Sequence, residues 1–118
     1  MATEEQDIQA VEAEHLLQVY KRVPIVLTRG KGSYVYDTED RPYLDFLSGI
    51  GVASLGHAHP GLAAAVADQA RTLLHTSNLY YHPFQGQLGR RLAALSGLPR
   101  AFFCNSGAEA NEGVLKLI

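Results

Sequence analysis

The sequence has a single cysteine, Cys104, so no disulfide can form within the chain. No uncharged apolar run approaches the roughly 20 residues of a membrane-spanning helix, and residues 62–67 are among the longest. Lysine and arginine number ten against twelve acidic residues, and no block carries one sign. This balance favours neither nucleic acid nor a membrane surface as a partner. Residues 1–14 are acidic and polar, whereas a secretory signal is basic and then apolar. We therefore expect a cytoplasmic protein.

The composition that remains is that of a globular protein. Hydrophobic residues make up 47% of the 118 residues and charged residues 19%. This length suits one small domain or a piece of a larger one. No internal repeat and no low-complexity segment is present.

Apolar residues recur at helical spacing in three stretches. The spacing predicts helices over residues 8–20, 60–74 and 83–96. Pro24 is expected to end the pattern of the first helix, and Gly97 to stop the third.

Residues 32–47 have the pattern of a β-hairpin. Two runs rich in tyrosine, valine and phenylalanine flank a polar turn at residues 37–41. Pro42 begins the second run, which suits an edge strand. The glycine-rich residues 48–61 that follow predict a loop with several unusual backbone angles.

The last 18 residues predict a strand, a tight turn and a helix. Residues 101–104 are a candidate buried strand, and residues 108–118 a helix. Ser106 suits the helix N-cap, and Glu109 completes a Ser-x-x-Glu capping box. The free N–H groups of such a turn can bind a phosphate, but an ordinary packed helix start is equally compatible with these residues. The P-loop is excluded because no Gly-Lys-Ser or Gly-Lys-Thr follows.

Three other patterns favour structural interpretations. His57-x-His59 has no clear third ligand, so we expect no metal site. Gly49-x-Gly51 lacks the third glycine of a dinucleotide fingerprint. Cys104 is expected to be a buried, inert small hydrophobe.

Several segments in order resemble one enzyme family. "FFCNSGAEANEGVLKLI", "YLDFLSGIGVASLGHAHP" and "HTSNLYY" resemble segments of the class III pyridoxal-phosphate aminotransferases. The resemblance extends from residue 20 to residue 118. It implies an α/β protein of the aspartate-aminotransferase fold (fold type I) with pyridoxal 5'-phosphate as cofactor.

The resemblance also implies roles for individual residues. Gly107 and Ala108 would bind the cofactor phosphate through their N–H groups, with Ser106 supporting the turn. Candidate substrate-binding residues are Tyr20, Ile50 and Asn78. Ser77 and Asn78 match a segment that family members place at a dimer interface near an active site. Members that act on ornithine resemble one another in having a tyrosine at the position of Ile50. The isoleucine therefore favours an acylated substrate.

By resemblance, residues 1–75 supply the helix and hairpin of a small domain with a connecting loop and helix. Residues 76–118 supply an interface segment, a helix and the start of the cofactor-binding large domain. Family members are several times longer, so we expect an N-terminal piece, inactive by itself, whose cofactor-binding lysine lies beyond Ile118.

The implied reaction of the whole protein is amino transfer between N-acetylornithine and 2-oxoglutarate, which belongs to arginine biosynthesis, in a homodimer. Two alternatives stay open. One is a class III enzyme for ornithine, succinylornithine or 4-aminobutyrate. The other is a non-catalytic binding or dimerisation fragment.

Overall fold

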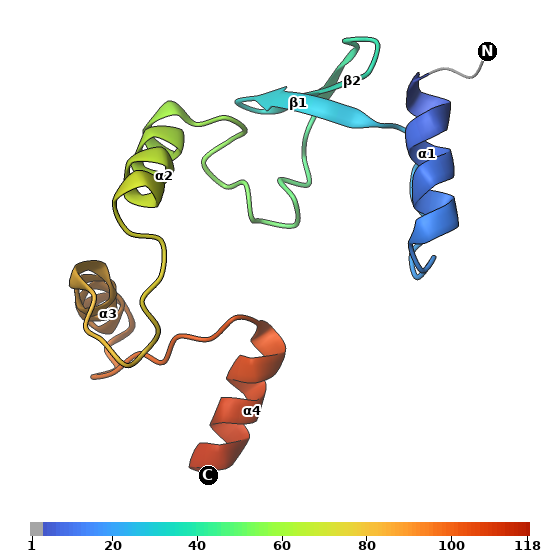
Figure 1. Cartoon of the computed structure of the whole chain (residues 1–118). Coiled ribbons are helices and arrows are strands. Elements are labelled where there is room, and N and C mark those ends of the chain that lie inside the picture. The colour runs from blue at the N-terminus through green and yellow to red at the C-terminus, as the bar shows by residue number, and fades with distance from the viewer. Residues whose placement is uncertain (1–3) are drawn as a thin grey trace. The chain divides into compact units, whose positions relative to one another are not determined.

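The computed structural model describes residues 4–118. The chain divides into two compact units, Met1–Thr72 and Leu73–Ile118. The first unit contains α1 (Glu4–His15), β1 (Leu27–Lys31), β2 (Tyr34–Asp37), β3 (Pro42–Leu44) and α2 (Pro60–Thr72). Figure 1 labels α1, β1, β2 and α2 of this unit. The second unit contains α3 (Pro83–Ser96) and α4 (Gly107–Leu117). Helices with a small sheet agree with the expected α/β class.

The sheet of the first unit has three antiparallel strands in the order β1-β2-β3. The predicted hairpin is confirmed as β2 and β3, in a register that pairs Tyr34 with Leu44. Pro42 lies on the edge strand, where its missing N–H costs no ladder bond. Strand β1 was not predicted, because its sequence, Leu-Thr-Arg-Gly-Lys, has no alternation of apolar and polar residues.

The turn between β2 and β3 is built around a buried carboxylate. Asp37 is only 2% exposed, and no other side chain of residues 4–118 is fully buried. Its Oδ1 accepts the backbone N–H groups of Glu39 and Arg41 at 3.0 and 2.9 Å. Its Oδ2 accepts Arg41 Nε at 2.6 Å and the Tyr43 hydroxyl at 2.8 Å. Burial by itself raises the pKa of Asp37, but these hydrogen bonds outweigh it and lower the pKa to about 2.

Helix α1 ends earlier than predicted. A helix is present here as predicted, but it stops at His15, so the predicted end at residue 20 and the expected stop at Pro24 are wrong. The Gln18 side chain hydrogen-bonds to two carbonyls at the helix end: its Nε2 donates to Glu12 O at 3.0 Å and to Leu16 O at 2.8 Å. Arg22 forms an ion pair with Glu12. These side-chain contacts turn the chain back along the helix.

Both ends of α3 and the start of α2 agree with the prediction, whereas α2 ends at Thr72, two residues before its predicted end, and α4 is shifted by one residue. Helix α2 begins at Pro60, and Leu62 N donates to His59 Nδ1 at 3.2 Å. In α3 the His82 side chain accepts the Phe84 N–H, and Gly97 closes the helix in a left-handed conformation with φ 74°. The capping role of His82 was not predicted.

Residues 101–104 do not form the predicted strand. They have no regular secondary structure and are exposed, and no strand of the described residues pairs with them. Two of their side chains instead lie near helices: a Cβ added at Gly113 of α4 would lie 3.4 Å from Phe102, and one added at Gly89 of α3 would lie 4.0 Å from Phe103. Cys104 is exposed, so its expected burial is also wrong.

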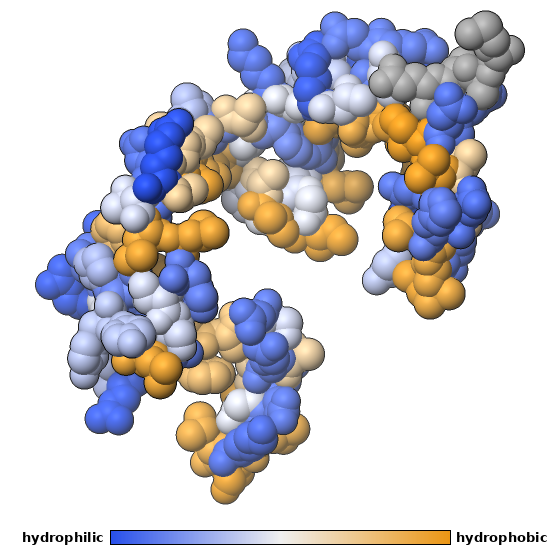
Figure 2. Space-filling model, in the orientation of Figure 1, coloured by the Kyte–Doolittle hydropathy of each residue, from blue (hydrophilic) through white to orange (hydrophobic). Residues whose placement is uncertain are grey.

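Residues 4–118 contain no buried hydrophobic side chain. Large apolar side chains are visible on the surface over every part of the chain (Figure 2). The apolar faces that predicted the helices therefore exist but are not covered within the described chain. Among the described helices, none is long and apolar enough to cross a membrane.

Candidate functional site

The first turn of α4 is held by a side-chain cap. Ser106 is extended, with φ −153° and ψ 162°, and its Oγ accepts the Glu109 N–H at 3.2 Å. This is the predicted N-cap. The first intrahelical bond runs from Ala110 N to Ser106 O at 3.0 Å.

The second half of the predicted capping box differs from expectation. Glu109 Oε2 accepts the N–H of Asn105 at 2.8 Å, one residue before the N-cap, and lies 3.2 Å from Asn105 Nδ2. The Glu109 carboxylate thus holds Asn105, the residue before the N-cap, through hydrogen bonds. The N–H groups of Gly107 and Ala108 have no intrahelical carbonyl to bond, because they occupy the first two helical positions.

Space around these N–H groups is open. A Cβ built on Gly107 would meet no atom within 4 Å. The N-terminal end of a helix carries a partial positive charge, so open N–H groups there favour an anion such as a phosphate. Lys116 lies in the last turn of the same helix and is paired with Glu112 at 2.7 Å. The groups available to an anion at the first turn are therefore the backbone N–H donors and not Lys116.

Asn78 lies in the connector before α3 and lines an open hollow of about 490 Å³. The hollow is bounded by Tyr80, Tyr81, His82, Gln85, Gly86, Ala101, Phe102 and Phe103. The turn at residues 106–108 does not line it. The structure thus keeps the three predicted phosphate-binding residues together in one turn and places Asn78 beside the segment that leads to that turn.

The other two predicted substrate residues belong to the first unit. Tyr20 lies in the connector between α1 and β1 and is exposed. Ile50 lies in the loop after β3 and is 93% exposed. Its φ is 60°, an unusual conformation for a β-branched residue. The predicted loop with unusual angles is confirmed here, since Ser48, Gly49, Ile50 and Gly51 all have positive φ.

The two histidines of His57-x-His59 bond to different partners. His57 Nε2 lies 2.6 Å from Asp45 Oδ2, and His59 caps α2. Hydrogen bonds from His57 and from the N–H groups of Ser48 and Leu47 lower the pKa of Asp45. The described residues hold no group of three or more potential metal ligands. Sequence reasoning missed the Asp45 partner, although "LDFLSG" and "LGHAHP" contain the two residues.

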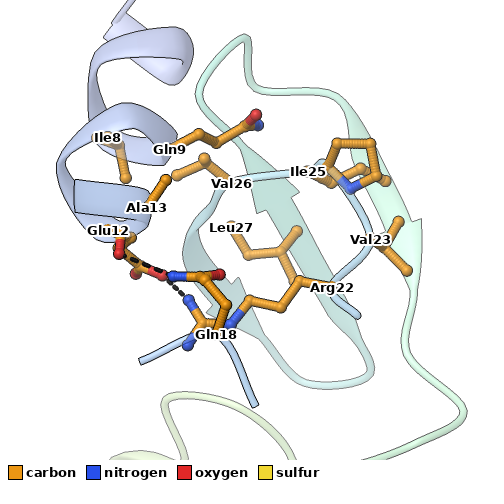
Figure 3. A pocket seen from close by; sticks show the side chains of 11 residues that line it. Ile8, Gln9, Glu12, Ala13, Gln18, Arg22, Val23, Ile25, Val26 and Leu27 are labelled. Carbon is orange, nitrogen blue, oxygen red and sulfur yellow. Dashed lines mark hydrogen bonds and ion pairs between the residues drawn. The ribbon is translucent and has the colours of Figure 1, made fainter. Parts of the chain in front are cut away.

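A second cavity, of about 410 Å³, lies between α1 and the chain that leads into β1 (Figure 3). Gln9, Glu12, Gln18 and Arg22 contribute its polar lining, and the remainder includes Ile8, Ala13 and Val23. Gln18 Nε2 donates to the backbone oxygen of Glu12, and Arg22 forms an ion pair with the Glu12 carboxylate. Tyr20 is not part of its wall.

Comparisons with known proteins identify the family of the chain. The family described as Aminotransferase class-III matches residues 17–118. The chain therefore belongs to the class III aminotransferases. It is 57% identical over 106 residues to an acetylornithine aminotransferase of Methanocaldococcus jannaschii. It is 54% identical over 110 residues to one of Gloeobacter violaceus. These matches cover 90% and 93% of this chain.

Solved structures of the family have the same fold. An acetylornithine aminotransferase from Elizabethkingia anophelis gives a TM-score of 0.91 at 34% identity, covering 98% of this chain and 30% of that one. An ornithine δ-aminotransferase from Plasmodium falciparum gives 0.90 at 38%, with the same coverage. The chain spans 27% and 28% of the length of the two curated relatives named above.

Proposed function

We propose that this chain forms part of a longer pyridoxal-phosphate-dependent aminotransferase, called the full-length enzyme below, and that the α4 turn binds the cofactor phosphate. The observation that carries the proposal is the turn itself, in a chain that belongs to the class III family. Ser106 caps it, and the N–H groups of Gly107 and Ala108 have no intrahelical partners.

The residues present fit a phosphate. Gly107 leaves the approach open, and Ala108 adds only a methyl group. Ser106 and Glu109 hold the turn before any ligand binds, so little order has to be gained on binding. When bound, pyridoxal phosphate supplies the electron sink for amino transfer. The part of this chain is to fix the phosphate end and so the orientation of the cofactor.

We propose N-acetylornithine as amino donor and 2-oxoglutarate as acceptor, a reaction of arginine biosynthesis. The support is the name of the relatives at 50–57% identity, which are acetylornithine aminotransferases. Ile50 adds a second argument, because an exposed apolar side chain suits an acyl group better than a charged amine. Tyr20 and Asn78 are proposed to contact the substrate as well.

We further propose that the full-length enzyme is a cytoplasmic homodimer. The lone cysteine, which needs no oxidising compartment, supports the location. Asn78 and the aromatic pair beside it support an interface, because exposed tyrosines are enriched at such surfaces. An ornithine-specific enzyme is the second candidate, supported by the similarity to the Plasmodium falciparum structure.

The test is a comparison of two amino donors. The full-length enzyme is assayed with 2-oxoglutarate and either N-acetylornithine or ornithine. We expect a higher kcat/KM for N-acetylornithine, since this ratio reports differential transition-state binding. Equal or reversed values would remove the acetylornithine assignment and keep the aminotransferase class. No turnover with either donor would remove the activity.

A further inference from the structure

Residues 45–57, called the closed loop below, begin and end at the same turn of the sheet. Asp45 N donates to Ser33 O at 2.9 Å. His57 exchanges two backbone hydrogen bonds with Gly32, at 2.8 and 2.9 Å. His57 also sits tightly against β1, because a Cβ added at Gly30 would lie 2.6 Å from His57 Cβ. The two ends of the closed loop are therefore fixed to the turn between β1 and β2.

A side-chain pair crosses the base of the closed loop. Asp45 Oδ2 and His57 Nε2 are 2.6 Å apart, with only 13% and 27% of the respective side chains exposed. Asp45 Oδ1 accepts the N–H groups of Leu47 and Ser48 at 2.8 and 2.9 Å. One carboxylate thus holds both the far end of the loop and the first residues of its tip.

Residues 48–51, called the tip, adopt a backbone conformation that needs the support of the Asp45 hydrogen bonds. The φ angles of Ser48, Gly49, Ile50 and Gly51 are 49°, 59°, 60° and 85°. Ile50 N and Gly51 N both donate to Leu47 O, at 2.8 and 3.3 Å, directly after the residues that Asp45 holds. Left-handed conformations of a β-branched residue are unfavourable and persist only where the surroundings impose them, often at functional sites.

We infer that Asp45 and His57 form a positioning pair that sets the conformation of Ile50 and thereby the selectivity for the acylated amino donor. The inference rests on the proposed function, because it assigns Ile50 to the substrate pocket. Neither residue of the pair contacts the substrate in this account. His57 orients the Asp45 carboxylate, and Asp45 shapes the tip through Leu47 and Ser48.

The variants separate the pair from the rest of the loop. His57→Ala removes only the side-chain pair and leaves the backbone bonds to Gly32 possible. His57→Gln restores a donor of similar reach. Asp45→Asn keeps an oxygen for the two N–H groups but loses the charge that faces His57. His59→Ala is the matched control, since it removes a histidine two residues away that caps α2 and does not touch Asp45.

Each variant of the full-length enzyme is assayed for kcat/KM with N-acetylornithine and with ornithine. We expect His57→Ala to lower the preference for N-acetylornithine on the order of tenfold or more, because small misplacements of a pocket residue have effects of this size. His57→Gln should recover part of the preference, and Asp45→Asn should lie between the two. His59→Ala should keep the wild-type preference.

Amide hydrogen exchange provides a readout independent of activity. In His57→Ala, the amides of Leu47, Ser48 and Ile50 should exchange faster than in the wild type, while those of β2 stay protected. If the wild type prefers N-acetylornithine but His57→Ala and His57→Gln both keep that preference and the exchange rates, the positioning inference is wrong. If the wild type itself shows no preference, the proposed donor is wrong. The exchange rates then decide whether the pair still shapes the tip.

Discussion

The two units of the chain are held by hydrogen bonds of different range. In Met1–Thr72, the side chains that fix the structure join distant residues, as Asp45 and His57 do across 12 positions and Glu5 and Val26 across 21. In Leu73–Ile118, the bonds that shape the helix ends join residues two to four positions apart, as in the His82 and Ser106 caps. Local bonds define where helices begin and end, whereas distant bonds also define how a loop and a sheet meet.

The units share one property, which is that neither buries a hydrophobic side chain among the described residues. Burial of apolar surface is the dominant favourable contribution to folding. The hydrogen bonds of both units therefore specify geometry more than they supply stability. The predictions below change one kind of bond or the other, beginning with the largest expected effect.

The 118-residue chain alone should lack a cooperative unfolding transition. Without buried apolar side chains, the hydrophobic contribution cannot offset the loss of conformational entropy. The near-UV circular dichroism signal should be weak, heating should give a gradual change, and transaminase turnover should be absent. A sharp transition together with turnover would contradict this prediction.

Gly107→Leu in the full-length enzyme should weaken cofactor retention by roughly tenfold to a hundredfold, the loss expected when one hydrogen bond to a charged group is blocked. The leucine side chain would occupy the open space over the first turn of α4. Cofactor absorbance after dialysis measures the effect. Gly86→Leu is the control, because Gly86 lies in α3 and also has open space around it. Equal cofactor retention by both variants would contradict the proposal that the α4 turn binds the phosphate.

Asp37→Asn should destabilise the first unit in a pH-dependent manner. The folded-state pKa is about 2 against an ordinary value of 3.8, so the ionised carboxylate stabilises the fold above the ordinary value. That contribution declines as pH falls from about 4 toward 2. In urea titrations of the full-length enzyme, the free energy of unfolding of the wild type should therefore exceed that of the variant by more at pH 6 than at pH 3. A difference that stays constant over this range would contradict the assignment.

Ser106→Ala should have the smallest effect, a loss of about 1 kcal/mol in the free energy of unfolding. It removes one local hydrogen bond at the start of α4, and water can reach the freed N–H of Glu109. Urea unfolding of the full-length enzyme measures it. Ser96→Ala is the control, since Ser96 bonds Leu98 after the end of α3 and has no N-cap role. Ser106→Asp should keep the stability, because aspartate is also a good N-cap.

Features with local causes could be predicted from the sequence. The bounds of α3 follow from Pro83, an apolar stripe and Gly97, all within the helix or next to it. The Ser106 cap and the hairpin of β2 and β3 follow in the same way, because their signals lie within a few residues of the structure they produce.

The candidate site shows where such reasoning stops. The capped first turn of α4, which is the proposed phosphate site, could be predicted because its cap and its small residues are contiguous. The Asp45–His57 pair could not, because 12 residues separate its members and only the folded loop brings them together. The hydrogen-bond partner of the Glu109 side chain also differed from the prediction, because the carboxylate accepts the N–H of Asn105 and not that of Ser106.

The sequence by itself determined the start and stop of α3, the N-cap of α4, the hairpin and the membership of the class III family. In each case the bonding partners are neighbours in the chain, or the residue pattern itself carries the family signal. The tertiary structure decided the end of α1, the third strand, the exposure of residues 101–104 and the conformation of Ile50. These depend on partners such as Gln18, β2 and Asp45, whose positions follow from the path of the whole chain. A strand needs another strand to bond, and a loop needs both its ends in place, so neither is fixed by local propensity alone.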